Sequence, residues 1–460
     1  MSILDRRTVL CSGAATLLVA SGKLAAKSRK TWDATALGAR GDGSTLNTRV
    51  IQSAIDAAGA AGGGTVTLAP GVYRTGSLFV KTGVTLMIGR EVTLLGSQDL
   101  SDYPIVQTRV AGIEMQWPAG LLNIYRARNA HITGEGTVDG DGKVFWDSYW
   151  NLRREYDSRG LRWAADYDCR RPRLIHVYES RDADISGLRL ARSGFWTVHV
   201  CYSRNVRVAD LNIRNNIGGR GPSTDGIDVD SSEHVTVESC DIEVNDDALC
   251  IKAGRDFDGL RVARPCRAVR IRDCIVRDGS AGITFGSETS GGFEDIDVSG
   301  LEVHAAVPTG IFFKSSHTRG GTIHKIRVRN IKLQGVRTVV GINLNWNPEY
   351  SYAKIPDGLT EVPSYWRALA TPVPAGKGIP HIFDVRIADV TARGSAVLFD
   401  VAGYPEAPMR DFHFSRLDLE AARGGRIVNA EHWRFDRCQL RTSDGAPPVL
   451  QNSSDIVGLR

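Results

Sequence analysis

Short runs in which apolar and polar residues alternate dominate the chain from about residue 130 onwards. Every second residue in such a run is apolar, which is the period of a half-buried β-strand. Three of these runs are Asn205-Val206-Arg207-Val208, His234-Val235-Thr236-Val237 and Ala268-Val269-Arg270-Ile271. Where they follow one another directly, the period is about 30 residues, which is typical of stacked repeat units. No helical pattern separates them, so folds built from βαβ units are disfavoured.

This repeat predicts an all-β fold, a right-handed parallel β-helix forming a single-stranded solenoid. One coil of short strands cannot bury its apolar face alone, whereas stacked coils bury a continuous core. A β-propeller is the alternative, with blades of about 40–45 residues. The shorter period and the lack of hairpin turn pairs favour the β-helix.

A different pattern precedes the repeat. After Asn47, apolar residues recur at helical spacing up to Ala58, and several glycines follow. We expect an amphipathic helix over 47–58, with Asn47 as its N-cap residue. Such a helix would cover the N-terminal end of the solenoid core.

The N-terminus predicts an export signal over residues 1–26. Charged residues, a short apolar run and small residues follow one another there. The pair Arg6-Arg7 before Val9-Leu10 indicates twin-arginine export, and a general secretory signal with a chance arginine pair is the alternative. No later stretch is apolar enough to span a membrane. We therefore expect a periplasmic or extracellular protein with one catalytic domain over 31–460.

Charge and cysteine content limit the kinds of substrate, nucleic acid and metal that the chain is expected to bind. The chain carries a net charge of +5, which suits an acidic substrate, and its basic residues are too scattered to favour nucleic acid. Seven cysteines follow the signal, and none lies in a Cys-x-x-Cys pair or a Cys/His metal spacing. We expect no metal, no cofactor and a monomer.

Two segments interrupt the repeat, near 145–173 and 344–380, and both are rich in aromatic residues. Long loops on a rigid solenoid commonly carry binding residues. Their aromatic rings could stack on sugars, although packing within the loops is the alternative for any one of them.

Two acidic motifs carry the candidate chemistry. They are Ser223-Thr224-Asp225-Gly226-Ile227-Asp228 and Asn245-Asp246-Asp247-Ala248-Leu249-Cys250-Ile251-Lys252. Their spacing of about one coil places Asp225 and the Asp246-Asp247 pair on neighbouring coils of one face. Repulsion between close carboxylates keeps one of them protonated, and glycosidic cleavage needs a protonated acid beside ionised ones. The alternative is that these aspartates only form turns.

Further motifs recur at coil-like intervals around this pair. They include Phe195-Trp196-Thr197-Val198-His199, Gly286-Ser287-Glu288 and Gly310-Ile311-Phe312-Phe313-Lys314. In their order and spacing, from Leu37-Gly38-Ala39-Arg40-Gly41-Asp42-Gly43 to Gly403-Tyr404-Pro405-Glu406-Ala407-Pro408, they resemble the polygalacturonase family, glycoside hydrolase family 28, and most closely its bacterial exo-acting branch.

The resemblance implies inverting hydrolysis of a pectic, galacturonic-acid-containing chain without a metal. It implies that Asp246 is the general acid and that Asp225 and Asp247 position the attacking water. It also implies that Lys314 binds a sugar carboxylate. We further expect His199, Lys252, Glu288 and Arg319 to bind substrate. Inverting action predicts acid and base carboxyl groups about 6.5–9.5 Å apart.

The chain departs from the family pattern at two positions. Ala281 stands where the family has histidine, and Phe312 stands where it has arginine. An arginine binds a carboxylate through two parallel hydrogen bonds, which phenylalanine cannot. Arg319 or His317 could supply the missing charge. Rhamnogalacturonan or another acidic plant or bacterial polysaccharide is therefore an alternative substrate. A polysaccharide lyase and a non-catalytic carbohydrate-binding β-helix are alternative functions.

Overall fold

The computed structural model describes residues 30–304 and 307–459. The predicted export signal over 1–26 lies outside these residues. The seven cysteines of the described part are all free. No helix in this part is both long and apolar enough to span a membrane.

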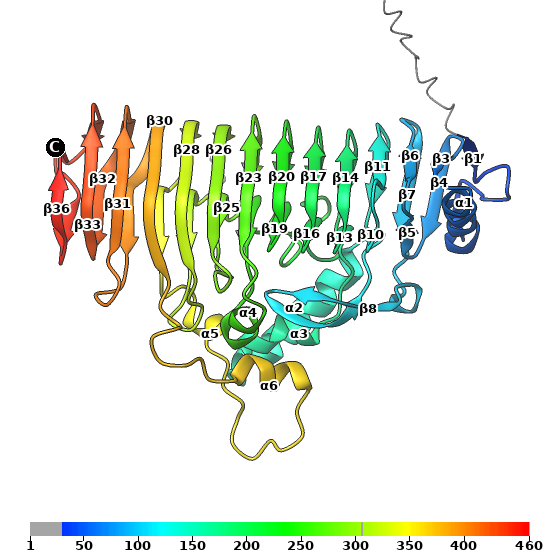
Figure 1. Ribbon diagram of the computed structural model, residues 1–460, viewed down its shortest axis with the longest axis horizontal. Coiled ribbons are helices and arrows are strands. Elements are labelled where there is room, and N and C mark those ends of the chain that lie inside the picture. Colours follow the sequence, from blue (N-terminus) through cyan, green and yellow to red (C-terminus); the bar gives the residue numbers. More distant parts are fainter. Residues whose placement is uncertain (1–29, 305–306, 460) are drawn as a thin grey trace, which may run out of the picture.

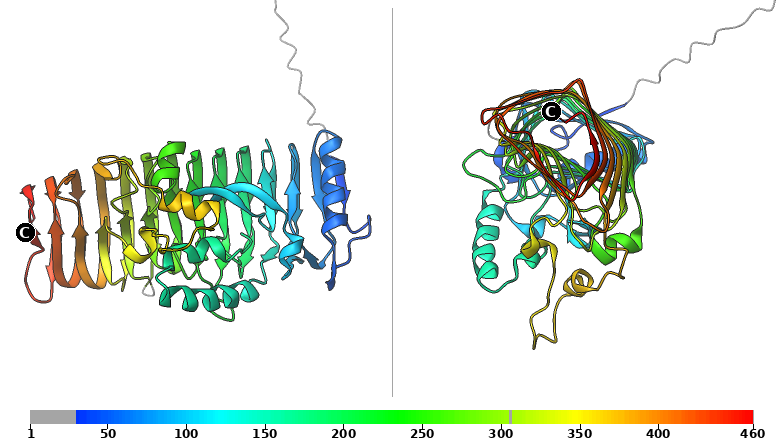
Figure 2. Two further views of the ribbon diagram at one scale, coloured as in Figure 1. Left: turned by 90° about the horizontal axis from the view of Figure 1, so that it is seen from below. Right: turned by 90° about the vertical axis from the view of Figure 1, so that its left-hand side faces the viewer.

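The described chain winds into a parallel β-helix, as the repeat predicts. Its coils lie side by side along the long axis, and the end-on view shows them stacked around one interior (Figures 1 and 2). Three ladders of parallel strands run along the solenoid, and the long strands β26, β28, β30 and β32 each contribute to more than one ladder.

The ladders contain these strands. The first comprises β1 (Thr31–Asp33), β3 (Gly64–Thr67), β6 (Val84–Ile88), β11 (His131–Gly134), β14 (Arg181–Ser186), β17 (Arg204–Ala209), β20 (Glu233–Glu238), β23 (Cys266–Arg272), β26 (Phe293–Val303), β28 (Thr322–Gln334), β30 (His381–Ala402), β31 (Met409–Ser415), β33 (Ala430–Asp436) and β36 (Ser454–Val457). The second comprises β2 (Asp42–Leu46), β4 (Gly71–Thr75), β7 (Val92–Gly96), β12 (Thr137–Asp139), β15 (Arg189–Ala191), β18 (Asn212–Arg214), β21 (Asp241–Glu243), β24 (Ile275–Asp278), parts of β26, β28 and β30, β32 (Asp418–Val428) and β34 (Gln439–Thr442). The third, which carries the candidate site, comprises β5 (Leu78–Val80), β10 (Leu122–Tyr125), β13 (Ile175–Tyr178), β16 (Val198–Cys201), β19 (Ile227–Asp230), β22 (Leu249–Lys252), β25 (Ala281–Phe285), β27 (Thr309–Lys314), β29 (Thr338–Asn343), parts of β30 and β32, and β35 (Val449–Gln451).

The core is built by the alternating residues. In register along the first ladder, Ile185, Val208, Val237, Ile271 and Val298 stack on one another, and each is at most 2% exposed. Burying each such side chain stabilises the fold by roughly 1.5–3 kcal/mol relative to leaving it exposed. The alternation that is visible in the sequence is therefore the division between core and surface.

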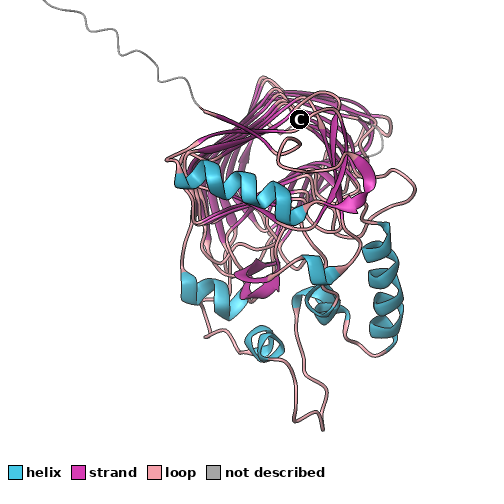
Figure 3. Ribbon diagram, turned by 90° about the vertical axis from the view of Figure 1, so that its right-hand side faces the viewer, coloured by secondary structure: helices cyan, strands magenta, loops and turns pink. Residues whose placement is uncertain are grey.

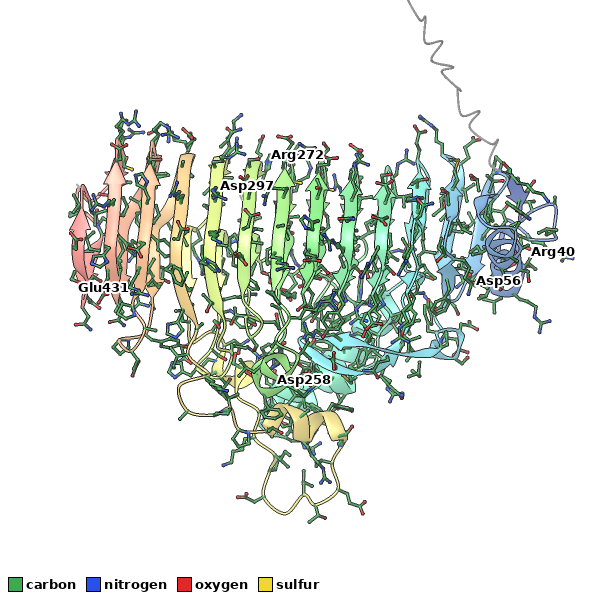
Figure 4. All side chains as sticks on the ribbon, viewed as in Figure 1. Arg40, Asp56, Asp258, Arg272, Asp297 and Glu431 are labelled. Carbon is green, nitrogen blue, oxygen red and sulfur yellow. The ribbon has the colours of Figure 1, made fainter. Side chains whose placement is uncertain are left out.

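The polar residues of the same strands form charged rows on the outer face. Arg272, which points away from the core in Figure 4, binds Glu238 of the neighbouring coil, and Arg329 lies 3.2 Å from Asp297. Exposed pairs of this kind contribute little stability individually. Their regular pairing keeps charge balanced along the solenoid.

Helix α1 (Thr48–Ala60) lies across the N-terminal end of the coils (Figure 3). It buries Ile51, Ala54, Ile55 and Ala58 against the core, where the sequence places a capping helix. Asn47 occupies the N-cap position, but the expected side-chain cap is wrong. Its amide instead accepts a hydrogen bond from the Arg40 backbone and donates to backbone carbonyls, which ties the preceding segment down.

The interruptions of the repeat project together from one side of the solenoid (Figure 1). The first contains α2 (Lys143–Ser158), η2 (Arg162–Ala164) and α3 (Ala165–Asp168), and the second contains α5 (Pro348–Ser351) and α6 (Ser364–Ala370). Beside them lie α4 (Asp256–Val262), the short η1 (Leu100–Asp102) and an antiparallel hairpin of β8 (Ile105–Val110) and β9 (Ile113–Pro118). The lack of hairpin turns expected from the sequence is wrong at this place, because β8 and β9 pair antiparallel. The two-residue turn Ala111-Gly112 gave too weak a signal.

Candidate active site

The register of the third ladder brings the predicted aspartates together. Ile227 pairs with Leu249, so Asp225 and Asp247 occupy equivalent positions on adjacent coils, just before β19 and β22. The Gly226 amide donates to the Asp247 carbonyl at 2.9 Å, which holds the two turns in line. One carboxylate oxygen from each of Asp225, Asp246 and Asp247 lies within 4.8 Å of the others. The three carboxylates therefore form one cluster.

The closeness of these oxygens follows from the strand spacing. Neighbouring strands lie about 4.8 Å apart, which places equivalent residues side by side. The about 6.5–9.5 Å expected for an inverting enzyme refers to whole acid and base carboxyl groups and not to their nearest oxygens, so that separation stays a prediction.

A pocket opens over the cluster. The solenoid contributes its floor, and three projecting segments contribute its walls: the turn of the β8–β9 hairpin and the two interruptions. The lining residues are Ala111, Arg162, Asp166, Phe195, Trp196, Ser223, Asp225, Asp246, Asp247, Lys252, Ser287, Glu288, Lys314, Trp346 and Tyr350. Of the interruptions' aromatic residues, only Trp346 and Tyr350 are among them, and others, such as Trp163 and Trp366, pack on each other within the loops.

Asp247 is held as an anion. Lys314 donates to its Oδ2 at 2.7 Å, and the hydroxyls of Ser280 and Thr284 donate to its Oδ1 at 2.6 and 2.9 Å. Burial alone would raise the pKa of Asp247, but the ammonium groups of Lys314 and Lys252 outweigh it and lower the pKa to about 2. This carboxylate stays ionised at neutral pH.

Asp246 is biased towards the protonated form. It is half-buried beside the ionised Asp247, and burial together with that neighbouring charge raises its pKa. Its Oδ1 accepts hydrogen bonds from the Asp247 amide at 2.9 Å and from Ser280 at 3.3 Å. The other carboxyl oxygen, Oδ2, remains available to hold a proton and face a ligand.

Asp225 shares a buried cage with Asp228, Lys252 and Glu288. The Lys252 ammonium lies 3.5 Å from Asp225, 3.5 Å from Asp228 and 3.3 Å from Glu288. Burial is the largest influence on the pKa of each aspartate: it raises the pKa of Asp225 well above the usual range and that of Asp228 to about 7. Lys252 also lies 4.8 Å from the centre of the Trp196 ring, which covers the cage.

The balance of charges in the pocket helps to explain why some of these carboxyl groups have lowered pKa values and others raised ones. Lys252 and Lys314 are the ammonium groups among five close carboxylates, and each balances one carboxylate. Asp247 and Glu288, both with a pKa of about 2, take that role, and Arg319 and Arg255 also lower the pKa of Glu288. Burial raises the pKa of each of the remaining three carboxyl groups, and the negative charges of neighbouring carboxylates raise it further. The pocket can therefore supply both a proton donor and a proton acceptor.

The residues expected to bind substrate divide into two groups. Lys314, Lys252 and Glu288 line the pocket. His199 and Arg319 do not, and both are fully buried, so the expectation that they contact substrate directly is wrong. The His199 ring lies beneath Trp196, at 4.8 Å between ring centres, and Arg319 is bound to Asp256 at 3.1 Å. His317, the other residue considered as a source of charge, packs on Tyr404 away from the pocket.

Some functional candidates escaped the sequence analysis. Ser280 and Thr284 hold Asp247, and in register Ala281 is the residue that lies beside Asp247 on the next coil. Two hydroxyls thus support the carboxylate near the position where the family pattern has histidine. Ser280 and Thr284 lie one coil after Asp247 in the sequence, and this spacing could have identified them. Arg162 had no such signal, because it lies in an interruption without a period.

Two clusters in the described part have the ligand types to hold a metal ion, Asp225–Asp246–Asp247 and His199–Cys201–Asp230. In the first, the Lys314 ammonium at 2.7 Å already supplies a positive charge. In the second, the Arg109 guanidinium lies 2.8 Å from Asp230 and does the same. Both arrangements favour an internal cation of the protein over a bound one.

Comparison with known proteins places this geometry in a family. Residues 70–360 match the model of the glycosyl hydrolases family 28. A probable polygalacturonase of Vitis vinifera is 29% identical over 84% of this chain and 73% of its own length. An exo-poly-alpha-D-galacturonosidase of Dickeya chrysanthemi is 26% identical over 70% of this chain and 59% of its own length.

Solved structures show the same fold. An exopolygalacturonase from Thermotoga maritima superposes with a TM-score of 0.75 at 24% identity, covering 90% of this chain and 92% of that one. A family 28 exopolygalacturonase of Yersinia enterocolitica gives 0.76 at 21% identity, covering 93% and 78%. The resemblance drawn from the motifs is confirmed: the chain belongs to glycosyl hydrolases family 28 and is a glycoside hydrolase with a right-handed parallel β-helix fold.

Proposed function

We propose that this protein is an exported, inverting hydrolase that removes sugar units from an end of pectic, galacturonic-acid-containing chains. The observation that carries the proposal is the Asp225–Asp246–Asp247 cluster, with Lys252 and Lys314, at the floor of a pocket walled by the two interruptions. The names of the relatives, which include exopolygalacturonases, point in the same direction.

Asp246 suits the general acid. Its raised pKa favours the protonated form more than in an ordinary aspartate, and its position at the pocket surface allows transfer to the leaving oxygen. Burial raises that pKa most, and the negative charge of Asp247 raises it further. This proton passes to the leaving oxygen as the glycosidic bond breaks, while a water molecule attacks the anomeric carbon from the opposite face and gives one proton to the base carboxylate.

Asp225 suits the general base better than Asp247 does. Asp247 is fully engaged by Lys314, Ser280 and Thr284 and has a pKa of about 2, so it is a weak proton acceptor. Asp225 has a raised pKa, and the Lys252 ammonium lies 3.5 Å from it, against 2.7 Å between the Lys314 ammonium and Asp247. Once ionised, a carboxylate with a raised pKa takes a proton from water more effectively than one whose pKa is about 2.

The walls support action at a chain end. Arg162 from the first interruption stacks on Tyr350 from the second, with the guanidinium 5.0 Å from the ring centre. Arg255 of the solenoid donates to the carbonyls of Tyr350 and Ser351 at 3.0 Å, which fixes this contact. A long chain would have to pass through these segments to be cut internally.

The experiment is an assay of purified protein on polygalacturonate and rhamnogalacturonan. We expect reducing ends without unsaturated uronate products, short products from the earliest time, and initial sugars with the anomeric configuration opposite to that of the cleaved bond, read by NMR. Unsaturated products would indicate a lyase, and no cleavage would overturn the proposal. Export is tested separately by locating the full-length chain and an Arg6→Lys/Arg7→Lys variant in cell fractions.

A further inference from the structure

We infer that Arg162 binds the carboxylate of a uronic acid at the walled end of the pocket and thereby selects an acidic sugar there. This role rests on the proposed function and adds a specificity-determining residue to it. It also identifies where this chain finds the positive charge that Phe312 lacks.

Arg162 reaches the pocket with unused hydrogen-bond donors. It lines the pocket together with Asp225 and Asp246, and its side chain is 13% exposed. Its Nη1 donates to Asp166 at 3.0 Å, whereas its buried Nε donates to no group of the described chain. A buried donor without a partner costs free energy, and a ligand oxygen would relieve that cost. The planar guanidinium suits a carboxylate, which can accept two parallel bonds.

The guanidinium is held in place before a ligand arrives. Asp166 is nearly fully buried and accepts a hydrogen bond from Ser223 at 2.7 Å as well as ion pairs from Arg162 and Arg171. The Tyr350 ring supports the other face of Arg162 at 5.0 Å. Little side-chain freedom therefore remains to be lost on binding, which favours affinity.

Local charge leaves Arg162 free to bind an anion. Two arginines, Arg162 and Arg171, share the single carboxylate of Asp166, so one positive charge is uncompensated. Arg171 is fully buried and donates to the Pro222 carbonyl, so the excess charge faces the pocket through Arg162. Lys252 and Lys314, the other cations of the lining, are already matched by carboxylates.

The pocket needs such a charge if its ligand is acidic. Asp225, Asp246, Asp247 and Glu288 all line it, and a uronate placed among them without a cation would be repelled. Phe312, which stands where the family pattern has arginine, does not line the pocket. The acidic sugar is therefore recognised from the loop wall and not from the solenoid floor at that position.

The test measures binding in the Asp246→Asn background, so that ligands are not cleaved. Affinity for galacturonic-acid oligomers and for the same oligomers reduced to neutral galactose units is compared by calorimetry. We expect Arg162→Gln to weaken binding of the acidic oligomers by about 10- to 100-fold and to leave the neutral ones unchanged. Arg153→Gln, in the same interruption and paired with the exposed Asp157, is the matched control and should change neither.

A second variant separates charge from shape. Arg162→Lys keeps a cation beside Asp166 but cannot form two parallel bonds, so acidic oligomers should bind about 10-fold more weakly than with arginine. Equal losses for acidic and neutral oligomers, or no loss in either variant, would overturn the role of Arg162. Cleavage by the unmodified enzyme is scored independently. If the enzyme cleaves pectic chains but binding does not depend on Arg162, only the role of Arg162 is refuted. If binding depends on Arg162 but no chain is cleaved, only the proposed hydrolysis is refuted.

Discussion

The floor and the walls of the pocket are built in different ways. On the floor, Asp225 and Asp247 are equivalent residues of adjacent coils, and backbone hydrogen bonds between the coils set their separation. In the walls, Arg162 and Tyr350 are 188 residues apart and meet through side-chain contacts between two helical interruptions. Repetition therefore places the reacting groups accurately, whereas the interruptions can change without disturbing them. Floor substitutions should act on the chemical step, and wall substitutions on substrate binding.

The largest effect is expected at Asp246. Asp246→Asn removes the transferable proton and should lower kcat by about 10³-fold while binding of oligosaccharides persists. Initial-rate kinetics and calorimetry measure the two quantities. Asp241→Asn is the control, since Asp241 lies on the same coil but pairs with Arg214 and Arg277 away from the pocket. Retention of more than a tenth of the activity would show that Asp246 is not the acid.

Lys314→Met should lower kcat by about 10²-fold, because it leaves Asp247 without its ammonium partner. Lys314 lowers the pKa of both Asp246 and Asp247, so both pKa values should rise in its absence. The alkaline limb of the pH profile, where Asp246 loses its proton, then moves to higher pH. The acidic limb, to which protonation of Asp247 contributes, moves the same way. Lys325→Met, which breaks an exposed pair with Glu294, is the control, and an unshifted profile would contradict this account.

A wall substitution should behave differently. The Trp346 ring lies 4.3 Å from the Lys314 ammonium and forms part of the second interruption. Trp346→Ala should raise KM by about 10-fold, change kcat by less than about 3-fold and lengthen the earliest products, because one side of the pocket opens. Chain-length analysis of early products measures the last effect. Trp150→Ala, on the exposed side of α2, should do none of this. A fall in kcat at constant KM would break the distinction between floor and wall.

The smallest effect concerns Asp228, beneath the floor. The negative charge of Asp228 raises the pKa of Asp225, so Asp228→Asn should lower it and move the acidic limb of the profile to lower pH by up to about one unit. Thermal stability provides a second measurement. The pKa of Asp228 is raised to about 7 in the folded protein, so Asp228 destabilises the fold progressively as pH rises from about 4 to 7. The Asn variant should therefore gain melting temperature at pH 8 and little at pH 4, and a pH-independent difference would refute the assignment.

Prediction from the sequence succeeded for residues whose place in the fold follows from the spacing of the repeat. The spacing of the two acidic motifs was enough to place Asp225 beside Asp247, and Glu288 and Lys314 followed one and two coils later. It failed for His199, because a strand residue in register with the site can lie beneath the pocket floor as readily as in it. It also failed for Arg319, whose exposure depends on how α4 and its Asp256 pack over it.

The sequence by itself determined the solenoid, its N-terminal helix, the family and the three aspartates, because alternation, coil spacing and motif order are all local or periodic properties. Only the tertiary structure decided which charges balance, which carboxyl groups have raised pKa values and which cation faces the pocket. Those outcomes depend on distances between segments that share no period, as with Arg162, Asp166 and Tyr350. Burial strengthens such contacts, and burial is a property of the folded arrangement.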